Sequence, residues 1–320
     1  PLFAALLLAG AVVTTVAQGD PIIIATGASA TSLQGTTLAD FAKRLQEKLG
    51  KDYDVKYYAD SQLGDEKELV QKLRLGTVNF TLISSYMSSI TPQFGLFDMP
   101  FVIKDRQHLL AIDRDVVHPT LAPPLESKGL KLISTWENGF RQITNSVRPI
   151  NVPADLAGIK LRVPPGVWRI KMFKAWDANP TPLNYGEVFV ALQTKVLDGQ
   201  ENPLTNVWGS KFYEVQKYLS MTNHLYSPAF LLTGAASWAK LPEKVRQAVM
   251  EIAPDVQKAA LAEGARLDDE LLGKLKATGM TVNTADRAAF VKASGPIYEE
   301  FGKEVPGGKQ LIDQALTLSK

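Results

Sequence analysis

The sequence predicts an α/β protein of two lobes that are braced by one long helix. Short apolar runs, typical of buried strands, alternate with segments of helical periodicity over residues 21–83, and the alternation resumes over residues 131–233. Residues 241–278 are rich in Ala, Lys, Glu and Leu and predict a single long helix. At about 150 residues per domain, the 320 residues suffice for two domains with separate cores.

The first lobe is predicted from three strands and two helices. The helical periodicity of residues 38–45 stops at Gly50, and that of residues 69–75 stops at Gly76, because glycine commonly ends helices. Strands are expected at residues 21–25, 53–58 and 80–83. This alternation indicates βαβ units and therefore a largely parallel sheet.

The second lobe repeats this pattern, and the chain then ends in helices. Strands are expected at residues 131–136, 141–144, 160–163, 227–233 and 280–283. Helices or helical turns are expected near residues 153–158, 167–175, 185–194, 211–215, 285–298 and 310–318. In the long helix, Pro242 suits the first turn, and Pro254 is the expected break.

The first 19 residues differ from the rest of the chain. They carry no charge, and residues 2–16 are almost wholly Leu, Ala, Val and Gly. The run has the length of a secretory hydrophobic region and is shorter than the roughly 20 residues that span a bilayer. We expect residues 1–19 to be the remnant of a signal peptide, cleaved after small residues, and the mature protein to be exported to the periplasm. A membrane anchor or a buried core helix is the alternative.

Composition excludes several classes of function. The chain has 35 Lys and Arg against 33 Asp and Glu, a net charge of +2, whereas a nucleic-acid-binding domain usually has a clear basic excess. Nucleic acid is therefore not an expected partner. Because the chain has no cysteine, disulfide scaffolds, thiolate metal sites, iron–sulfur clusters and cysteine nucleophiles are excluded.

The search for catalytic chemistry is mostly negative. The sequence has no G-x-S-x-G, P-loop, G-x-G-x-x-G or H-E-x-x-H motif, and its three histidines are far apart. Asp198 and Glu201 could be imagined as an acid/base pair, but the segment D-G-Q-E-N-P at residues 198–203 is typical of a polar turn with capping or solvated carboxylates. We expect no catalytic residue, no metal and no cofactor.

Two arginines and an asparagine are candidates for binding an anion. Arg162 lies where a predicted strand runs into the loop at residues 164–165, and ligands gather at the carboxyl ends of strands in open α/β sheets. Its planar guanidinium can hold a carboxylate by two parallel hydrogen bonds. Lys160 shares its face, however, which also suits a solvent-facing edge. Arg141 begins another predicted strand, and Asn202 could donate its amide to the same anion or stabilise a turn.

Four aromatic residues follow these strands on predicted helices or loops. Most such residues belong to a core, but one or two could line a cleft, because pockets for small organic ligands are largely apolar and aromatic. The four residues are Trp168, Tyr185, Phe189 and Trp208, of which we expect Tyr185, Trp168 and Trp208 to bind ligand.

A series of short motifs is spread along the chain after residue 19. They are S-Q-L-G-D at residues 61–65, N-G-F-R at 138–141, G-I-K-L-R-V-P at 158–164, N-P-T-P at 179–182, G-E-V-F-V-A-L-Q at 186–193, D-G-Q-E-N-P at 198–203 and K-F-Y-E-V-Q-K-Y-L at 211–219. Together, and in this order, they resemble the solute-binding subunits of TRAP transporters (tripartite ATP-independent periplasmic transporters), the DctP-type extracytoplasmic solute receptors. The resemblance covers essentially the whole chain after residue 19.

The resemblance implies a two-lobe periplasmic binding protein fold of type II-like architecture, with hinge strands and a long helix bridging the lobes. Because the chain of such proteins crosses between lobes more than once, we expect lobe I to comprise residues 20–138 and 228–267, and lobe II residues 139–227 and 268–320. It also implies that Arg162 is the main carboxylate clamp and that Arg141 and Asn202 assist it. The implied partners are a small organic acid and the membrane-embedded subunits of an ion-gradient-driven permease without an ATPase. We expect a monomer.

Positions that differ from sialic-acid-binding members of that family narrow the ligand. Those members carry an acidic residue where this chain has Ser84, and asparagines where it has Gly27 and Pro165. We expect Ser84 to be one of the ligand-binding residues. The resemblance therefore disfavours sialic acid and favours a hydroxy acid, dicarboxylate, keto acid or sugar acid.

Two other functions stay open at this point. The same binding fold could present its ligand to a membrane sensor instead of a permease. Alternatively, the chain could be a secreted enzyme acting on a small acid, which would need an acid, a base or a metal centre beside Arg162.

Overall fold

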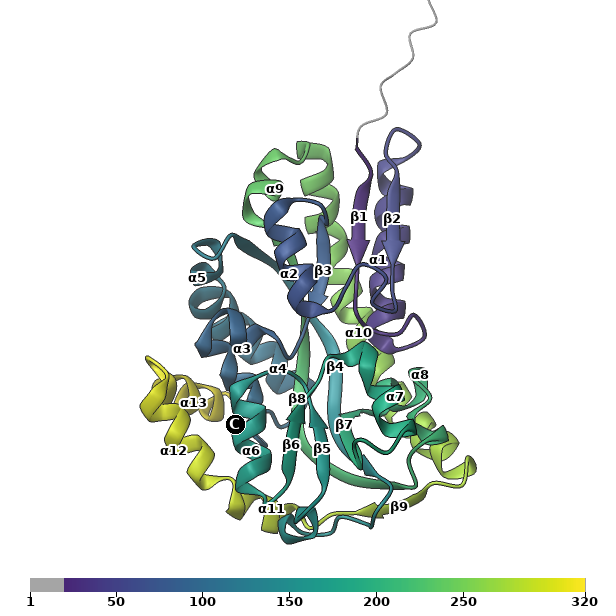
Figure 1. The fold of residues 1–320 in the computed structure, drawn as a ribbon. Coiled ribbons are helices and arrows are strands. Elements are labelled where there is room, and N and C mark those ends of the chain that lie inside the picture. Colours follow the sequence, from purple (N-terminus) through teal and green to yellow (C-terminus); the bar gives the residue numbers. More distant parts are fainter. Residues whose placement is uncertain (1–19, 320) are drawn as a thin grey trace, which may run out of the picture.

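The computed structural model describes residues 20–319, so the predicted signal-peptide remnant at residues 1–19 lies outside the described residues. The described chain forms a two-lobe α/β structure around one mixed sheet (Figure 1). Within residues 20–319 this sheet has nine strands in the order β2-β1-β3-β8-β4-β7-β5-β6, with β9 paired to β8. They are β1 (Ile22–Ala25), β2 (Val55–Tyr58), β3 (Phe80–Ile83), β4 (Leu130–Asn145), β5 (Lys160–Val163), β6 (Asn179–Pro182), β7 (Gly199–Pro203), β8 (Tyr218–Gly234) and β9 (Thr281–Thr284).

Parallel pairing is found at the two ends of the sheet and between β8 and β9. Strands β1, β2 and β3 pair in parallel in one lobe, and β5, β6 and β7 do so in the other. Between them, β4 and β8 are antiparallel to each other, and β3 and β7 are antiparallel to these central strands. The prediction of a largely parallel sheet is therefore wrong at its centre.

The long antiparallel strands β4 and β8 run through both lobes, as hinge strands should (Figure 1). The sequence predicts β4 as two strands and only the last part of β8. The reason lies in β-bulges, one of them between Glu137 and Gly139, where Gly139 has a φ of 122°. A bulge adds a residue and shifts the alternation of buried and exposed side chains. The apolar pattern of the single strand β4 therefore predicts two separate strands.

Helix α10 (Glu243–Ala277) confirms the predicted long helix, but it continues through Pro254. Proline inside a helix removes a hydrogen bond and costs about 3 kcal/mol. Here Val249, Ile252 and Val256 are buried in the core of lobe I on both sides of the proline, and Leu271 is buried in the core of lobe II. Packing against both lobes holds the helix straight enough to bridge them.

The remaining helices cover both faces of the sheet. Those confirming a prediction include α1 (Leu33–Leu49), α2 (Glu66–Leu75), α6 (Val167–Ala175), α7 (Val188–Gln193) and α13 (Gly308–Thr317). The expected helix at 285–298 is two helices, α11 (Arg287–Ala293) and α12 (Gly295–Glu304), because Pro296 begins the second. Helices and turns without a prediction are α3 (Met87–Ile90), η1 (Pro92–Asp98), α4 (Arg106–Ile112), η2 (Asp113–Leu121), α5 (Pro123–Glu126), α8 (Leu204–Gly209) and α9 (Ala235–Lys240); η3 (Pro153–Leu156), η4 (Tyr185–Glu187) and η5 (Phe212–Glu214) are short turns at or within predicted helical segments.

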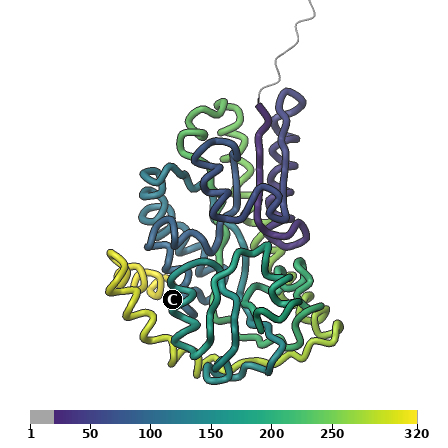
Figure 2. The backbone as a smooth tube through the Cα atoms, viewed as in Figure 1, coloured from purple at the N-terminus to yellow at the C-terminus, as the bar shows by residue number. Residues whose placement is uncertain are grey.

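The C-terminal helices brace the two lobes on one side. Helix α12 packs on α6, and α13 packs on α12 and η1. The yellow segment of Figure 2 therefore lies beside both α6 and η1. At this contact a side chain on Gly95 would collide with Trp168, whose ring lies 5.1 Å from that of Phe301.

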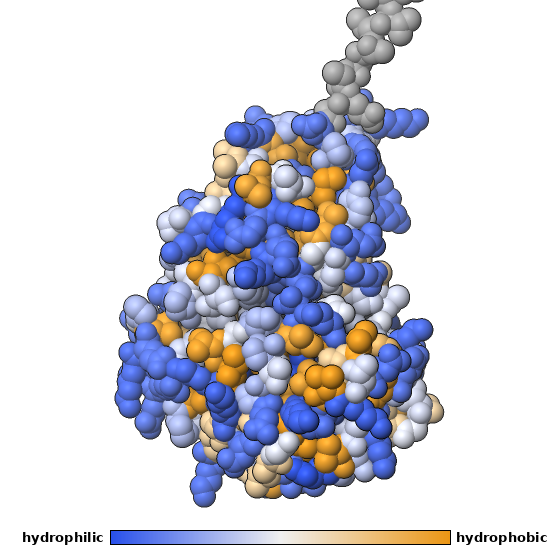
Figure 3. Space-filling model, in the orientation of Figure 1, coloured by the Kyte–Doolittle hydropathy of each residue, from blue (hydrophilic) through white to orange (hydrophobic). Residues whose placement is uncertain are grey.

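On the face drawn in Figure 3, hydrophobic residues are scattered among hydrophilic ones. No helix within residues 20–319 is long and apolar enough to cross a bilayer.

We expect Gly264→Ala to destabilise the protein, because α10 lies directly on the buried Glu137 of β4. A Cβ at Gly264 would lie 2.7 Å from Oε1 of Glu137, which Arg106 and Tyr226 hold in place. Overpacking of this kind costs about 1–3 kcal/mol of unfolding free energy. Gly273→Ala on the same helix is the control, because nothing lies within 4 Å of its Cβ; it should raise stability by up to about 1 kcal/mol. Urea unfolding of both variants checks this, and equal effects would contradict the packing argument.

Candidate ligand-binding site

A cavity of about 720 Å³, part of it open to solvent, lies between the two lobes. Lobe I contributes the turn after β1, the start of α2 and the segment after β3, and lobe II contributes the loop after β5 and the strand β7. Ligands gather at such carboxyl ends of parallel strands. The polar lining residues include Thr26, Gln34, Asp65, Glu66, Lys67, Ser84, Ser85, Asn138, Arg141, Arg162, Asn184, Tyr185, Asn202 and Asn206.

Strand β7 contributes Asn202 to the lining of the cavity. The sequence predicts this segment as a polar turn and not as a strand. It pairs with β4 on one side and β5 on the other, and all five residues are buried. Glu201 is fully inaccessible to solvent. The prediction is wrong because its polar residues find partners only after folding: Gln200 donates to Thr144, and Asn202 donates to Gln200. A run of polar residues without apolar alternation carries no local signal for a buried strand.

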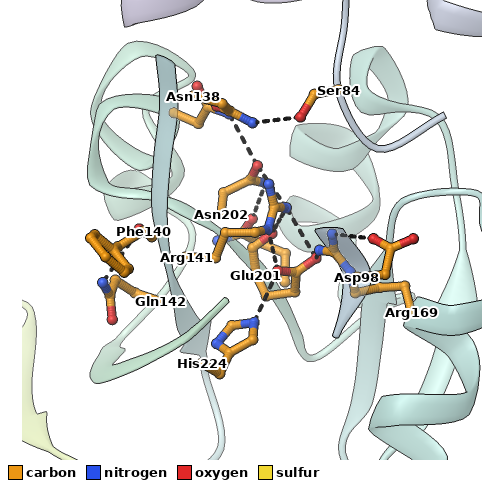
Figure 4. A network of polar contacts seen from close by, with 12 residues as sticks. Ser84, Asp98, Asn138, Phe140, Arg141, Gln142, Arg169, Glu201, Asn202 and His224 are labelled. Carbon is orange, nitrogen blue, oxygen red and sulfur yellow. Dashed lines mark hydrogen bonds and ion pairs between the residues drawn. The ribbon is translucent and has the colours of Figure 1, made fainter. Parts of the chain in front are cut away.

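Glu201 is the centre of a buried ionic network (Figure 4). Arg141 donates from Nε and Nη2 to the carboxylate of Glu201, and Arg169 of α6 donates from Nη1 at 2.6 Å. His224 of β8 contacts the same carboxylate through Nε2 at 3.2 Å. Arg169 also pairs with Asp98 at 2.9 Å. In Figure 4, Arg141, His224 and Arg169 converge on Glu201 from β4, β8 and α6, and Asp98 of η1 lies against the far side of Arg169.

The network fixes the ionisation of its members. Burial alone would raise the pKa of Glu201, but the guanidinium groups of Arg141 and Arg169 outweigh it and hold that pKa far below its usual range. Burial also lowers the pKa of His224, against the opposing effect of Glu201. Glu201 is therefore a permanent anion that orients both arginines.

Arg162 differs from the other two buried arginines. It is 2% exposed, and its Nε donates to the carbonyl of Leu183 at 2.8 Å. Its two terminal nitrogens have no hydrogen-bond partner, and it forms no ion pair, within residues 20–319. Burial lowers the pKa of Arg162 to about 10, so it stays charged at neutral pH. A buried cation without a counter-ion is costly, and an anionic ligand in the cavity would remove that cost.

A chain of amides and hydroxyls lines the cavity beside the arginines. Asn202 accepts from Nη2 of Arg141 at 3.1 Å and from Asn206 at 3.1 Å. Asn138 donates to Ser84 at 3.2 Å, and Ser84 in turn donates to the carbonyl of Pro228. These groups fix one another, so the cavity offers preformed polar contacts from both lobes.

Glu66 is a lining residue that the sequence analysis missed. It begins α2, and its two carboxylate oxygens accept from the backbone N–H groups of Ser84 at 2.6 Å and Tyr86 at 2.9 Å. Loss of contact with water raises the pKa of Glu66, against those two hydrogen bonds and the charges of Arg162 and Arg141. Glu66 belongs to none of the motifs described above. It directly follows the S-Q-L-G-D turn, and this position in the sequence was the signal that could have indicated a role in the site.

The structure brings together five of the seven residues expected to bind ligand. Arg162, Arg141, Asn202, Tyr185 and Ser84 all line the cavity. Tyr185 lies with its ring 5.9 Å from the guanidinium of Arg162, and its hydroxyl is 2.6 Å from that of Ser210.

The other two expected residues lie elsewhere. Trp168 is buried against Phe301 in the brace between α6 and α12. Trp208 stacks on Tyr213 at 5.0 Å, on the side of lobe II that faces α10. Phe189, noted among the aromatics, lines a groove next to the cavity on the other side of Tyr185. Spacing after a strand places a residue near the sheet edge but does not fix the direction of its side chain.

Two lobes that share hinge strands, with a buried cation between them that has no ion-pair partner in the described part of the chain, define a ligand-binding protein of the two-lobe class. Residues 24–304 match the model of the bacterial extracellular solute-binding protein family 7, and the chain belongs to that family.

Among its relatives is the 2,3-diketo-L-gulonate-binding periplasmic protein YiaO of Escherichia coli (strain K12), 35% identical over 89% of this chain and 88% of the relative. The sugar acid binding protein DctPAm of Advenella mimigardefordensis, solved with galactonate, is 31% identical, with a TM-score of 0.89 over 94% of this chain and 97% of the other. A TRAP solute-binding protein of Sulfurospirillum deleyianum DSM 6946, solved with succinate, is also 31% identical, with a TM-score of 0.88 over 93% and 98%.

We expect Glu201→Gln to destabilise the fold in a pH-dependent way. Removing one partner of a buried ion pair costs about 3–5 kcal/mol at neutral pH. Because the folded-state pKa of Glu201 is depressed, its contribution is complete above the unfolded value of about 4.5 and is lost as the pH falls below it. The difference in unfolding free energy between wild type and variant should therefore shrink below about pH 4.5. Glu263→Gln on the surface of α10 is the control, and a constant difference down to pH 3 would contradict the assignment.

Proposed function

We propose that this chain is a periplasmic solute-binding protein that captures a small organic carboxylate and delivers it to an ion-gradient-driven TRAP permease. In this proposal it is a carrier of its ligand and not an enzyme. The lobes that close on the ligand comprise residues 20–138 with 228–267, and residues 139–227 with 268–320.

The observation that carries this proposal is the state of Arg162. Its guanidinium is buried and charged, its terminal nitrogens have no partner among the described residues, and it lines a cavity between two lobes. Arg141 lines the same cavity, and its Nη1 has no hydrogen-bond partner among the described residues. Two neighbouring guanidinium groups with free N–H donors suit a bidentate carboxylate. Exclusion of water on closure then strengthens the contact.

Glu66 favours a hydroxylated monocarboxylate over a dicarboxylate. Its carboxylate lines the cavity that holds Arg162 and Arg141, and a second ligand carboxylate would face this anion. A hydroxyl would instead donate to it. The relatives solved or named with galactonate and 2,3-diketo-L-gulonate support a sugar acid, whereas the one solved with succinate keeps a dicarboxylate as the alternative outcome.

A thermal-shift screen of sugar acids, hydroxy acids, keto acids and dicarboxylates tests the function. A ligand at a hundred times its dissociation constant stabilises the folded protein by about 2.7 kcal/mol, which is readily detected. We expect D-galactonate or a related aldonate to raise the melting temperature most. Stabilisation by neutral sugars alone would contradict the carboxylate clamp.

We expect Arg162→Ala to abolish binding while the protein stays folded. Removing one partner of a buried, hydrogen-bonded charge pair costs at least about 2 kcal/mol, or roughly 30-fold in affinity. Lys160→Ala is the matched control, because it lies on the same strand with its side chain in solvent. Isothermal titration calorimetry measures the affinity, and tight binding by folded Arg162→Ala protein would overturn the proposal.

We expect Glu66→Gln to shift selectivity toward dicarboxylates. Neutralising the residue removes the like-charge repulsion on a second carboxylate, so the ratio of succinate to D-galactonate affinity should rise by about tenfold. Glu68→Gln, two residues further along α2 and outside the cavity lining, is the control; glutamine preserves its role in the capping box of α2. Competition titrations of both acids give the ratio, and an unchanged ratio would contradict the assigned role of Glu66.

A further inference from the structure

Arg169 connects the arginine network to the other lobe. Its Nη1 donates to Glu201 at 2.6 Å and its Nη2 to Asp98 at 2.9 Å. The residue is 2% exposed, and its Nε is buried with no hydrogen-bond partner in the described part of the chain. Glu201 and Asp98 are thus its two anchors, and the loss of either leaves a buried guanidinium held at one end.

The path from Asp98 to the ligand cavity is short but indirect. Asp98 and Arg169 do not line the cavity, whereas Arg141 does. Arg141 and Arg169 both donate hydrogen bonds to the carboxylate of Glu201 (Figure 4). A change in the position of Arg169 would therefore move that carboxylate and, with it, Arg141. Asp98 ends η1, in the segment between β3 and β4 assigned to lobe I. Arg169 and Glu201 belong to lobe II in that division, so the ion pair crosses the lobes.

We propose that the Asp98–Arg169 ion pair is a positioning element that holds Arg141, through Glu201, in the geometry that binds the ligand carboxylate. The proposal rests on the proposed function, because it concerns the same site. Asp98 and Arg169 do not touch the ligand in it. Their task is to fix from lobe I the orientation of a clamp residue in lobe II.

Charge alone would predict the opposite effect of removing Asp98. The deep cluster holds three guanidinium groups and two carboxylates, which leaves one positive charge for the ligand; its members are Arg141, Arg162, Arg169, Glu201 and Asp98. Neutralising Asp98 adds positive potential and should tighten the binding of an anion. If Asp98 acts by positioning, neutralising it weakens binding. The sign of the change separates the two.

The first experiment measures the dissociation constant of D-galactonate, or of the acid with the largest thermal shift, by calorimetry for wild type and Asp98→Asn. We expect the dissociation constant to rise about tenfold, within the range for residues coupled in one network. Asp268→Asn is the control, because it also removes an acid from an ion pair, with Arg106, away from the cavity. An unchanged or lower dissociation constant for Asp98→Asn would overturn the proposal.

A double-mutant cycle with Arg141→Lys tests whether Asp98 acts through Arg141. In the Arg141→Lys background, Asp98→Asn should change the dissociation constant by less than about twofold, because the residue it positions is already altered. A general structural effect would multiply with that of Arg141→Lys instead. Independent, multiplying effects would therefore contradict the positioning role even if Asp98→Asn alone weakens binding.

A second variant keeps the test valid if Asp98→Asn does not fold, as judged by circular dichroism. Arg169→Lys preserves the charge balance but lacks the planar fork that spans Glu201 and Asp98. We expect a similar loss of affinity, and wild-type affinity would overturn the proposal. If wild-type protein binds no organic acid in the screen, the proposed function fails; if it binds and these variants bind equally well, only this inference fails.

Discussion

The burial of Glu201 in strand β7 of lobe II is the constraint on which the site depends. An isolated carboxylate at this depth is too costly to keep charged, so β7 can exist only with cations beside it. Arg141 and Arg169 supply them, and both are thereby fixed in direction. Arg162 completes the cluster without an ion-pair partner among residues 20–319. The fold thus stabilises two arginines internally and leaves a third cation to be matched by a ligand.

The same cluster connects the binding site to the architecture of the lobes. Arg141 and His224 lie on β4 and β8, the strands that run through both lobes, and Asp98 reaches across from the segment after β3. Ligand contacts that differ between an open and a closed arrangement are what shift the population between them. Because the ionic network is built on the hinge strands themselves, the clamp is held by rigid elements while the lobes around it can move.

Much of the fold follows from local pattern, whereas the site depends on contacts that no local pattern carries. Strands such as β1 and β5, and helices that end at Gly50 or Gly76, have apolar periods and stop signals that tertiary packing did not override. Strand β7 is polar throughout, and its partners are distant in sequence, so its burial could not be foreseen. By alternation Arg162 lies on the same face of β5 as Lys160, yet Lys160 is exposed and Arg162 is buried. Arg162 pairs with β6 on one side and β7 on the other, whereas Lys160 pairs with β6 alone. Motif order, not periodicity, singled out Arg162 and Arg141, and both line the cavity.

The two ends of the cavity differ in how they are built, and this separates affinity from selectivity. Arg141 and Arg162 lie on β4 and β5, where hydrogen bonds to strands on both sides fix the backbone. Glu66, Gln34 and Gly27 lie at helix starts and in the turn after β1, where the chain tolerates change more readily. A carboxylate is common to many organic acids, so the same arginines on these rigid strands can bind all of them. The net charge of +2 plays no part in this, because a few placed groups decide which acid fits.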